Sequence, residues 1–275
     1  MSISAADVMK LRKATGAGMM DCKNALAEAN GDFERATEII REKGKLVASK
    51  RADREATEGV VLAKVTADKK SGCMIVLNCE TDFVAKNEGF ISFAGKILDL
   101  ATTNNAADLN AVKAMDMDGR TVEAQVLEQT GIIGEKLDLP FFSGIKAESV
   151  VAYIHPGNKL AALVGFNKAN VDGQVAKDIA MQVAAMNPVS IDKDSVPAEV
   201  VAKELEIARE KFRMEGKPEA MLDRIAQGAL QKFYKENTLL NQAFIKESKQ
   251  TVADYLKSND KDLTVTAFVR YALSE

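Results

Sequence analysis

The chain has 275 residues, of which 47% are hydrophobic and 28% charged, as in ordinary globular proteins. It has no apolar stretch of the ~20 residues that a membrane helix needs and no secretion signal at its start, so we expect a cytoplasmic protein without a membrane partner. Its 37 Lys and Arg residues against 40 Asp and Glu give a net charge of −3, which argues against direct nucleic-acid binding through phosphate contacts.

Residues 1–44 are predicted to form a module of three short helices. Ser4 and Asp32 are good N-terminal caps for the first and third helix, and Gly44 is expected to end the third. About 40 residues are too few for a deep core. We therefore expect this module to offer a surface to another molecule.

Residues 45–58 are charged and rich in alanine, and we interpret them as a helical or loosely ordered linker. The linker contains four basic residues that we expect to form a solvated face and not a phosphate site. These are Lys45, Lys50, Arg51 and Arg54.

The rest of the chain contains a faint internal repeat of a hairpin followed by a helix. The first unit has strands within 59–80 and a helix at 90–101, and the second has strands within 149–169 and a helix at 174–186. The repeat predicts an α+β protein with two similar core subdomains, 59–145 and 146–275, each an antiparallel sheet backed by helices. The last segment should form a short helix and a final strand, and that strand should complete the second sheet.

Between residues 197 and 237, two helical patterns flank "MEGKPEA", which favours an antiparallel helical hairpin inserted in the second subdomain. Each pattern has one narrow apolar stripe that should face the other helix. The stripes are Val201, Leu205, Ala208 and Phe212 in the first helix, and Leu222, Ile225, Ala229 and Phe233 in the second.

The motifs of common enzymes are missing from the chain. It has no phosphate-binding loop of the form G-x-x-x-x-G-K-[ST] and no G-x-S-x-G nucleophile motif. Its single histidine, His155, lies in a predicted turn, and there is no Cys/His cluster for zinc. We therefore predict neither an enzyme nor a bound cofactor or metal.

The three cysteines, Cys22, Cys73 and Cys79, are an odd set without a short-spaced pair, which indicates reduced thiols. Cys73 and Cys79 are six residues apart, so on a strand they point to the same face. We interpret them as small buried hydrophobic side chains. A thiol enzyme that uses this pair is an alternative.

The segment "NCETDFVAKNEG", residues 78–89, places Phe83 where the chain should turn through water. Turns usually take small polar residues, so a large ring there needs either a core beneath it or a partner above it. The residues alone leave both interpretations open. The corresponding part of the second unit, "NKANVDGQVA", has no Asp-Phe pair, so the fold does not demand one.

Two segments resemble signatures of one family. "TGAGMMDCKNALAEANGD" (15–32) and "NCETDFVAKNEGF" (78–90) are similar to motifs of bacterial elongation factor Ts, the guanine-nucleotide exchange factor for elongation factor Tu. The resemblance extends over nearly the whole chain. It implies a ubiquitin-associated-like (UBA-like) N-terminal module, two α+β subdomains and an inserted coiled-coil hairpin.

The resemblance also implies a set of site residues. Thr81, Asp82, Phe83 and Val84, which we call the TDFV segment, would reach the GTPase domain of elongation factor Tu and disturb its magnesium site. The implied partner is elongation factor Tu in its GDP-bound and nucleotide-free states. Further implied partner contacts are Lys23, Ile133, Gly134 and His155, with Ile245 and Lys246 as looser matches. Some family members continue into a further contact helix, which is not expected here because the chain stops at Glu275.

A passive protein-binding module is the main functional alternative to an exchange factor. In that case the N-terminal helices would hold a partner without promoting nucleotide release.

Overall fold

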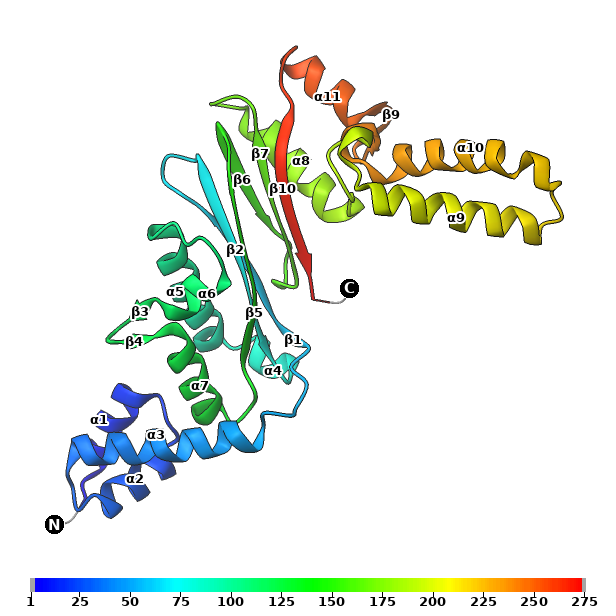
Figure 1. Cartoon of the computed structure of the whole chain (residues 1–275). Helices are drawn as coiled ribbons and strands as arrows, with labels where there is room; N and C mark the ends of the chain where they lie inside the picture. The colour runs from blue at the N-terminus through cyan, green and yellow to red at the C-terminus, as the bar shows by residue number, and fades with distance from the viewer. Residues whose placement is uncertain (1–2, 274–275) are drawn as a thin grey trace.

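The computed structural model describes residues 3–273 and shows a mixed α+β protein with antiparallel sheets, which confirms the predicted fold class. Two sheets lie face to face at the centre of the molecule, with helices on both outer sides (Figure 1). The N-terminal helices extend from one side and a long helical hairpin from the other (Figure 1).

The N-terminal bundle consists of α1 (Ala5–Thr15), α2 (Met19–Glu28) and the first part of α3 (Phe33–Lys50). Ser4 caps α1 through a reciprocal bond pair with Asp7, and Asp32 caps α3 by accepting a hydrogen bond from the Arg35 N–H, as the sequence predicts. Buried side chains from all three helices, Leu11 and Cys22 among them, form a small separate core.

The third helix does not end at Gly44, so that prediction is wrong. It continues to Lys50 because Gly44 lies where α3 crosses α7 (Val122–Ile133). A methyl group at Gly131 of α7 would collide with the Cα of Gly44, so glycine permits the close approach. The N-terminal bundle is therefore joined to the core by a helix that is itself packed on the core.

Each of the two central sheets has three antiparallel strands. The first contains β1 (Glu58–Val65), β2 (Ser71–Cys79) and β5 (Asp138–Lys146) in the order β1-β2-β5. The second contains β6 (Ser149–Ile154), β7 (Leu160–Phe166) and β10 (Val265–Ala272) in the order β10-β7-β6. In both, a hairpin is joined by a later strand beside its second strand, so the repeat read from the sequence corresponds to one shared topology.

The inner faces of the sheets pack on each other through apolar side chains such as Val61, Met74 and Leu163. The outer face of the first sheet is covered by α5 (Glu88–Thr103), α6 (Leu109–Ala114) and α7, and that of the second by α8 (Gly173–Met186) and α11 (Val252–Asn259). Small two-stranded ribbons, β3–β4 (Asp116–Met117, Arg120–Thr121) and β8–β9 (Ala243–Phe244, Glu247–Thr251), lie outside these layers. Within residues 3–273, no helix has both the length and the apolar character needed to span a membrane.

The hairpin that projects from the side of the second sheet is built from α9 (Ala198–Met214) and α10 (Glu219–Asn237), packed against each other. Short 3-10 turns precede and follow it, at Lys193–Ser195 and Leu239–Asn241. The predicted stripe of α10 is only partly right. Leu222 is buried, but the other buried residues are Ala226 and Leu230, because the contact follows an i, i+4 row and leaves Ile225 at the edge of the interface.

Candidate functional site

The TDFV segment forms a projecting corner directly after β2. Thr81 caps the one-turn helix α4 (Asp82–Ala85) by accepting a hydrogen bond from the Val84 N–H. Val84 packs against the core of the first sheet and Ala85 is buried, whereas Phe83 points outward with 84% of its surface exposed. Phe83 therefore has no core beneath it.

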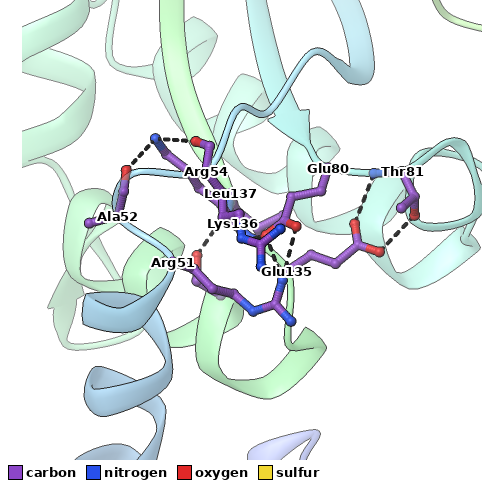
Figure 2. Close-up of polar contacts among 9 residues, drawn as sticks. Arg51, Ala52, Arg54, Glu80, Thr81, Glu135, Lys136 and Leu137 are labelled. Atoms are coloured by element: carbon purple, nitrogen blue, oxygen red, sulfur yellow. Dashed lines mark hydrogen bonds and ion pairs between the residues drawn. The ribbon is translucent and has the colours of Figure 1, made fainter.

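Glu135 holds the start of α4 from a segment 54 residues further along the chain. The Thr81 backbone N–H donates to Glu135 Oε2 at 3.0 Å, and the Thr81 hydroxyl donates to Glu135 Oε1 at 2.7 Å (Figure 2). Glu135 follows Gly134, which ends α7 in the left-handed conformation with φ of 81°. This turn aims the Glu135 carboxylate at α4.

Glu80 makes the reverse connection, from the residue before the TDFV segment to the residues that follow α7. Its carboxylate accepts from the Lys136 backbone N–H at 2.6 Å and from Arg51 Nη1 at 2.8 and 2.9 Å (Figure 2). The hydrogen bond from Lys136 and the ion pair with Arg51 lower the pKa of Glu80 below its ordinary value. The interpretation of Arg51 as part of a solvated face is wrong, since its guanidinium binds Glu80, whose side chain is only 16% exposed.

Asp82 lies at the surface beside its neighbour in the next helical turn. Lys86 Nζ contacts Asp82 Oδ2 at 2.6 Å, and this hydrogen bond lowers the pKa of Asp82. The charge of Lys159 acts on Asp82 in the same direction. The pair with Lys86 contributes little to stability because both side chains face water. Asp82 therefore presents a negative charge next to the Phe83 ring.

Three of the other predicted contact positions lie close to this corner. Ile133 and Gly134 form the end of α7, directly before Glu135. His155 lies in the exposed β6–β7 turn, where its Nδ1 is 2.9 Å from the Tyr153 hydroxyl. The same turn is attached to β1 by a 2.6 Å hydrogen bond from the Val61 N–H to the Asn158 carbonyl.

The remaining predicted contacts lie elsewhere. Lys23 is exposed on α2, in the N-terminal bundle. Ile245 and Lys246 lie between β8 and β9, near α11 and away from α4 (Figure 1). Lys246 Nζ binds the buried Asp178 at 2.6 Å, and Asp178 also accepts from the Tyr255 hydroxyl at 2.9 Å. The structure thus places the predicted residues in three separate regions, of which the TDFV corner is the densest.

The cysteine pair gives no support to thiol chemistry. Cys73 and Cys79 are both buried in the core of the first sheet, as the sequence predicts. Burial, followed by the negative charge of Glu135, raises the pKa of Cys79 to about 12, so its nucleophilic thiolate is disfavoured at neutral pH. Across residues 3–273, no group of three His, Cys, Asp or Glu side chains is placed to hold a metal ion.

The fold and the TDFV corner together describe an α+β protein that displays one exposed aromatic ring, Phe83, on a short helix whose start is hydrogen-bonded to Glu135. The family model described as "Elongation factor TS" matches residues 80–275. Proteins named elongation factor Ts are 50% identical in Azobacteroides pseudotrichonymphae, 53% in Christiangramia forsetii and 52% in Porphyromonas gingivalis, each aligned over at least 98% of both chains. The chain belongs to the elongation factor Ts family, the nucleotide exchange factors of elongation factor Tu.

Residue-by-residue reading of the sequence missed Glu80, Glu135 and Lys136 as parts of this site. Glu80 directly precedes the TDFV segment, and Glu135 and Lys136 directly follow the predicted contact Gly134. A charged residue beside each of two implied contact motifs was the available signal. The pairing itself joins positions more than 50 residues apart, which no local periodicity reveals.

Proposed function

We propose that this chain binds elongation factor Tu in its GDP-bound state and promotes GDP release by disturbing the magnesium and phosphate site. It then stabilises the nucleotide-free partner until GTP binds. The observation that carries the proposal is Phe83, a large apolar ring that is 84% exposed on a helix whose start is fixed by two hydrogen bonds to Glu135. A ring held in this way can be inserted into a partner without first being ordered, which lowers the entropic cost of binding.

The exchange reaction requires no covalent step. An exchange factor must bind the nucleotide-free partner more tightly than the nucleotide-bound one, and by reciprocity the nucleotide weakens the factor as much as the factor weakens the nucleotide. GTPases hold their phosphates through a backbone cradle and a magnesium ion. Displacing the elements that position this ion is enough to loosen the nucleotide.

The residues of the TDFV segment take different roles in this proposal. Phe83 is the apolar wedge, and Asp82 places a negative charge beside it. Thr81 fixes the start of α4, and Val84 anchors the helix to the core. Further partner contacts are proposed at Lys23, Ile133, Gly134 and His155.

We propose the finer architecture on the family resemblance. Residues 1–44 form a UBA-like module, 45–58 a linker, and 59–145 and 146–275 the two core subdomains, with a coiled-coil hairpin at 197–237. Because α3 runs to Lys50, the first part of that linker is helical. The chain acts in the cytoplasm on elongation factor Tu and needs neither a cofactor nor direct contact with nucleic acid or membrane.

The test is the release of fluorescently labelled GDP from elongation factor Tu of the same organism, chased with excess unlabelled GDP. We expect the release rate to rise with the concentration of this chain and to saturate. A chain that forms a complex with elongation factor Tu but leaves the release rate unchanged would be a passive binding module, and the proposal would be wrong.

A further inference from the structure

We infer that Glu135 is a positioning residue for the exchange reaction, which acts through Thr81 to set the orientation of Phe83, and that Glu80 connects the same contact to the N-terminal bundle. The inference rests on the proposed function, because it assigns to these carboxylates the task of holding the wedge. Neither carboxylate belongs to the TDFV segment.

The first observation is that α4 is too short to be stable on its own. It has four residues, and so short a helix is unstable without outside contacts. Its N-terminal cap is the Thr81 hydroxyl, which accepts from the Val84 N–H and donates its own proton to Glu135. A hydroxyl has one proton and two lone pairs, so donation to Glu135 orients a lone pair toward Val84. Glu135 therefore orients the Thr81 hydroxyl that caps α4, and it also accepts a hydrogen bond from the Thr81 backbone N–H.

The second observation is that two segments hold each other reciprocally. The Glu135 carboxylate accepts the backbone N–H of Thr81, and the Glu80 carboxylate accepts the backbone N–H of Lys136 (Figure 2). We call this exchange between 80–81 and 135–136 the carboxylate clasp. Hydrogen bonds to charged groups are among the stronger ones in proteins. The clasp thus fixes the corner from which Phe83 projects.

The segment that carries Glu135 is itself fixed. The Leu137 backbone N–H donates to the Thr130 hydroxyl of α7 at 3.0 Å, and the Leu137 side chain is buried in the core of the first sheet. The clasp therefore joins α4 to a segment that is itself anchored to α7 and to the core of the first sheet.

The third observation is the link to the N-terminal bundle. Arg51, the residue that follows Lys50 and caps the C-terminus of α3, contacts both oxygens of Glu80. The Lys136 ammonium donates to the carbonyls of Ala52 and Arg54 at 2.8 and 2.9 Å (Figure 2). The end of α3 and the start of α4 are thus joined by one cluster of charged groups. This cluster fixes the position of the N-terminal bundle relative to Phe83.

A double-mutant cycle on GDP release tests the inference. Glu135→Ala should lower the maximal release rate at saturating factor about 10-fold, since one charged hydrogen-bond acceptor is lost. In a Phe83→Ala background the same change should lower the rate less than about 2-fold, because the group that Glu135 positions is gone. Equal losses in the two backgrounds would overturn the inference.

Two further comparisons separate positioning from folding. Glu123→Ala removes an exposed glutamate from the same helix, α7, that precedes Glu135, and should leave release and melting at wild-type values. If Glu135→Ala melts at a lower temperature than wild type, two variants of Thr81 separate positioning from folding. Thr81→Val, which lacks the hydroxyl, should lose much more exchange activity than Thr81→Ser, which keeps it. Equal exchange by the two Thr81 variants would contradict the inference. Absence of stimulated release by the wild-type chain would instead refute the proposed function.

Discussion

Two projections of the molecule expose a large apolar side chain almost completely, and different kinds of contact hold them in place. Phe83 on α4 is 84% exposed, and Met214 at the tip of the α9–α10 hairpin is 81% exposed. The start of α4 is fixed by the carboxylate clasp, whose acceptors are partly buried. The hairpin tip is held by ion pairs of Arg213 with Glu210 and Glu219, all at the surface.

The two supports differ in how firmly they fix the exposed side chain. Surface ion pairs such as those of Arg213 contribute ~0–1 kcal/mol and leave long side chains free to move. A buried or partly buried carboxylate that accepts two directed hydrogen bonds fixes a geometry. Exposure alone therefore does not separate the two residues, whereas their supports do, and we expect the binding role at Phe83.

The largest expected effect concerns these two residues directly. Phe83→Ala should lower the affinity for elongation factor Tu roughly 30- to 1,000-fold, the range for losing a central aromatic anchor. Met214→Ala removes an equally exposed side chain and should change affinity less than about 2-fold. Titration of stimulated GDP release with each variant measures both. If Met214→Ala were as harmful as Phe83→Ala, the comparison between the two projections would fail.

Both changes should leave thermal unfolding almost unaltered, because neither side chain packs in the core. A buried aromatic ring would instead cost ~3–5 kcal/mol on truncation. A large fall in the melting temperature of Phe83→Ala, with exchange restored at high concentration, would mean that the ring is structural.

The next effect tests whether the half of the molecule that carries the wedge is rigidly joined to the N-terminal bundle. Gly131→Ala should push α3 from α7 and destabilise the chain by ~1–3 kcal/mol, as overpacking does, which is a fall of roughly 2–10 °C in melting temperature. Gly95→Ala, within α5, meets no atom within 4 Å and should stabilise slightly or have no effect. Equal melting of the two variants would show that the helix crossing is not tightly packed.

A smaller effect is expected at Lys23, which is exposed on α2 and far along the chain from the clasp. An exposed ion pair is worth ~0–1 kcal/mol, so Lys23→Ala should weaken complex formation at most about 5-fold. Removal of residues 1–44 should weaken it much more, since the whole contact area of the bundle is lost. Similar losses from the two changes, measured by titration calorimetry, would contradict this assignment.

The smallest effect is expected for the other projection. The buried side chains within α9 and α10 pack on each other, so deletion of residues 199–235 with a short loop in their place should leave cooperative unfolding of the rest of the chain intact. Calorimetric melting of the deleted chain measures this. Loss of a single cooperative transition would show that the hairpin supports the core.

The sequence predicted those parts of the fold that depend on neighbouring residues. Ser4 and Asp32 are predicted as helix caps, and the two hairpins from their apolar runs and the turns between them. Gly44 was misread as a stop because the reason for glycine there is the backbone of α7, almost 90 residues away. The sequence pattern also predicts Ile225 as a buried residue of α10, whereas Ala226 is buried in its place, because the contact with α9 determines which residues face inward.

The candidate site, too, was predictable only in the part that depends on neighbouring residues. Phe83 stood out because a large ring in a turn is unusual locally, and the structure leaves it exposed. The clasp was not foreseen, since Glu80 and Glu135 become neighbours only after the first sheet and α7 have packed. Long-range polar contacts of this kind carry no sequence period.

The most direct test of the proposed wedge is the magnesium dependence of its effect. Stimulated GDP release should be measured for wild type and Phe83→Ala, first with Mg²⁺ and then with the ion removed by a chelator. If Phe83 acts by disturbing the magnesium site, the two proteins should differ strongly with Mg²⁺ and much less without it, because the chelator has already done what the ring does. An equally large difference in both conditions would contradict the account.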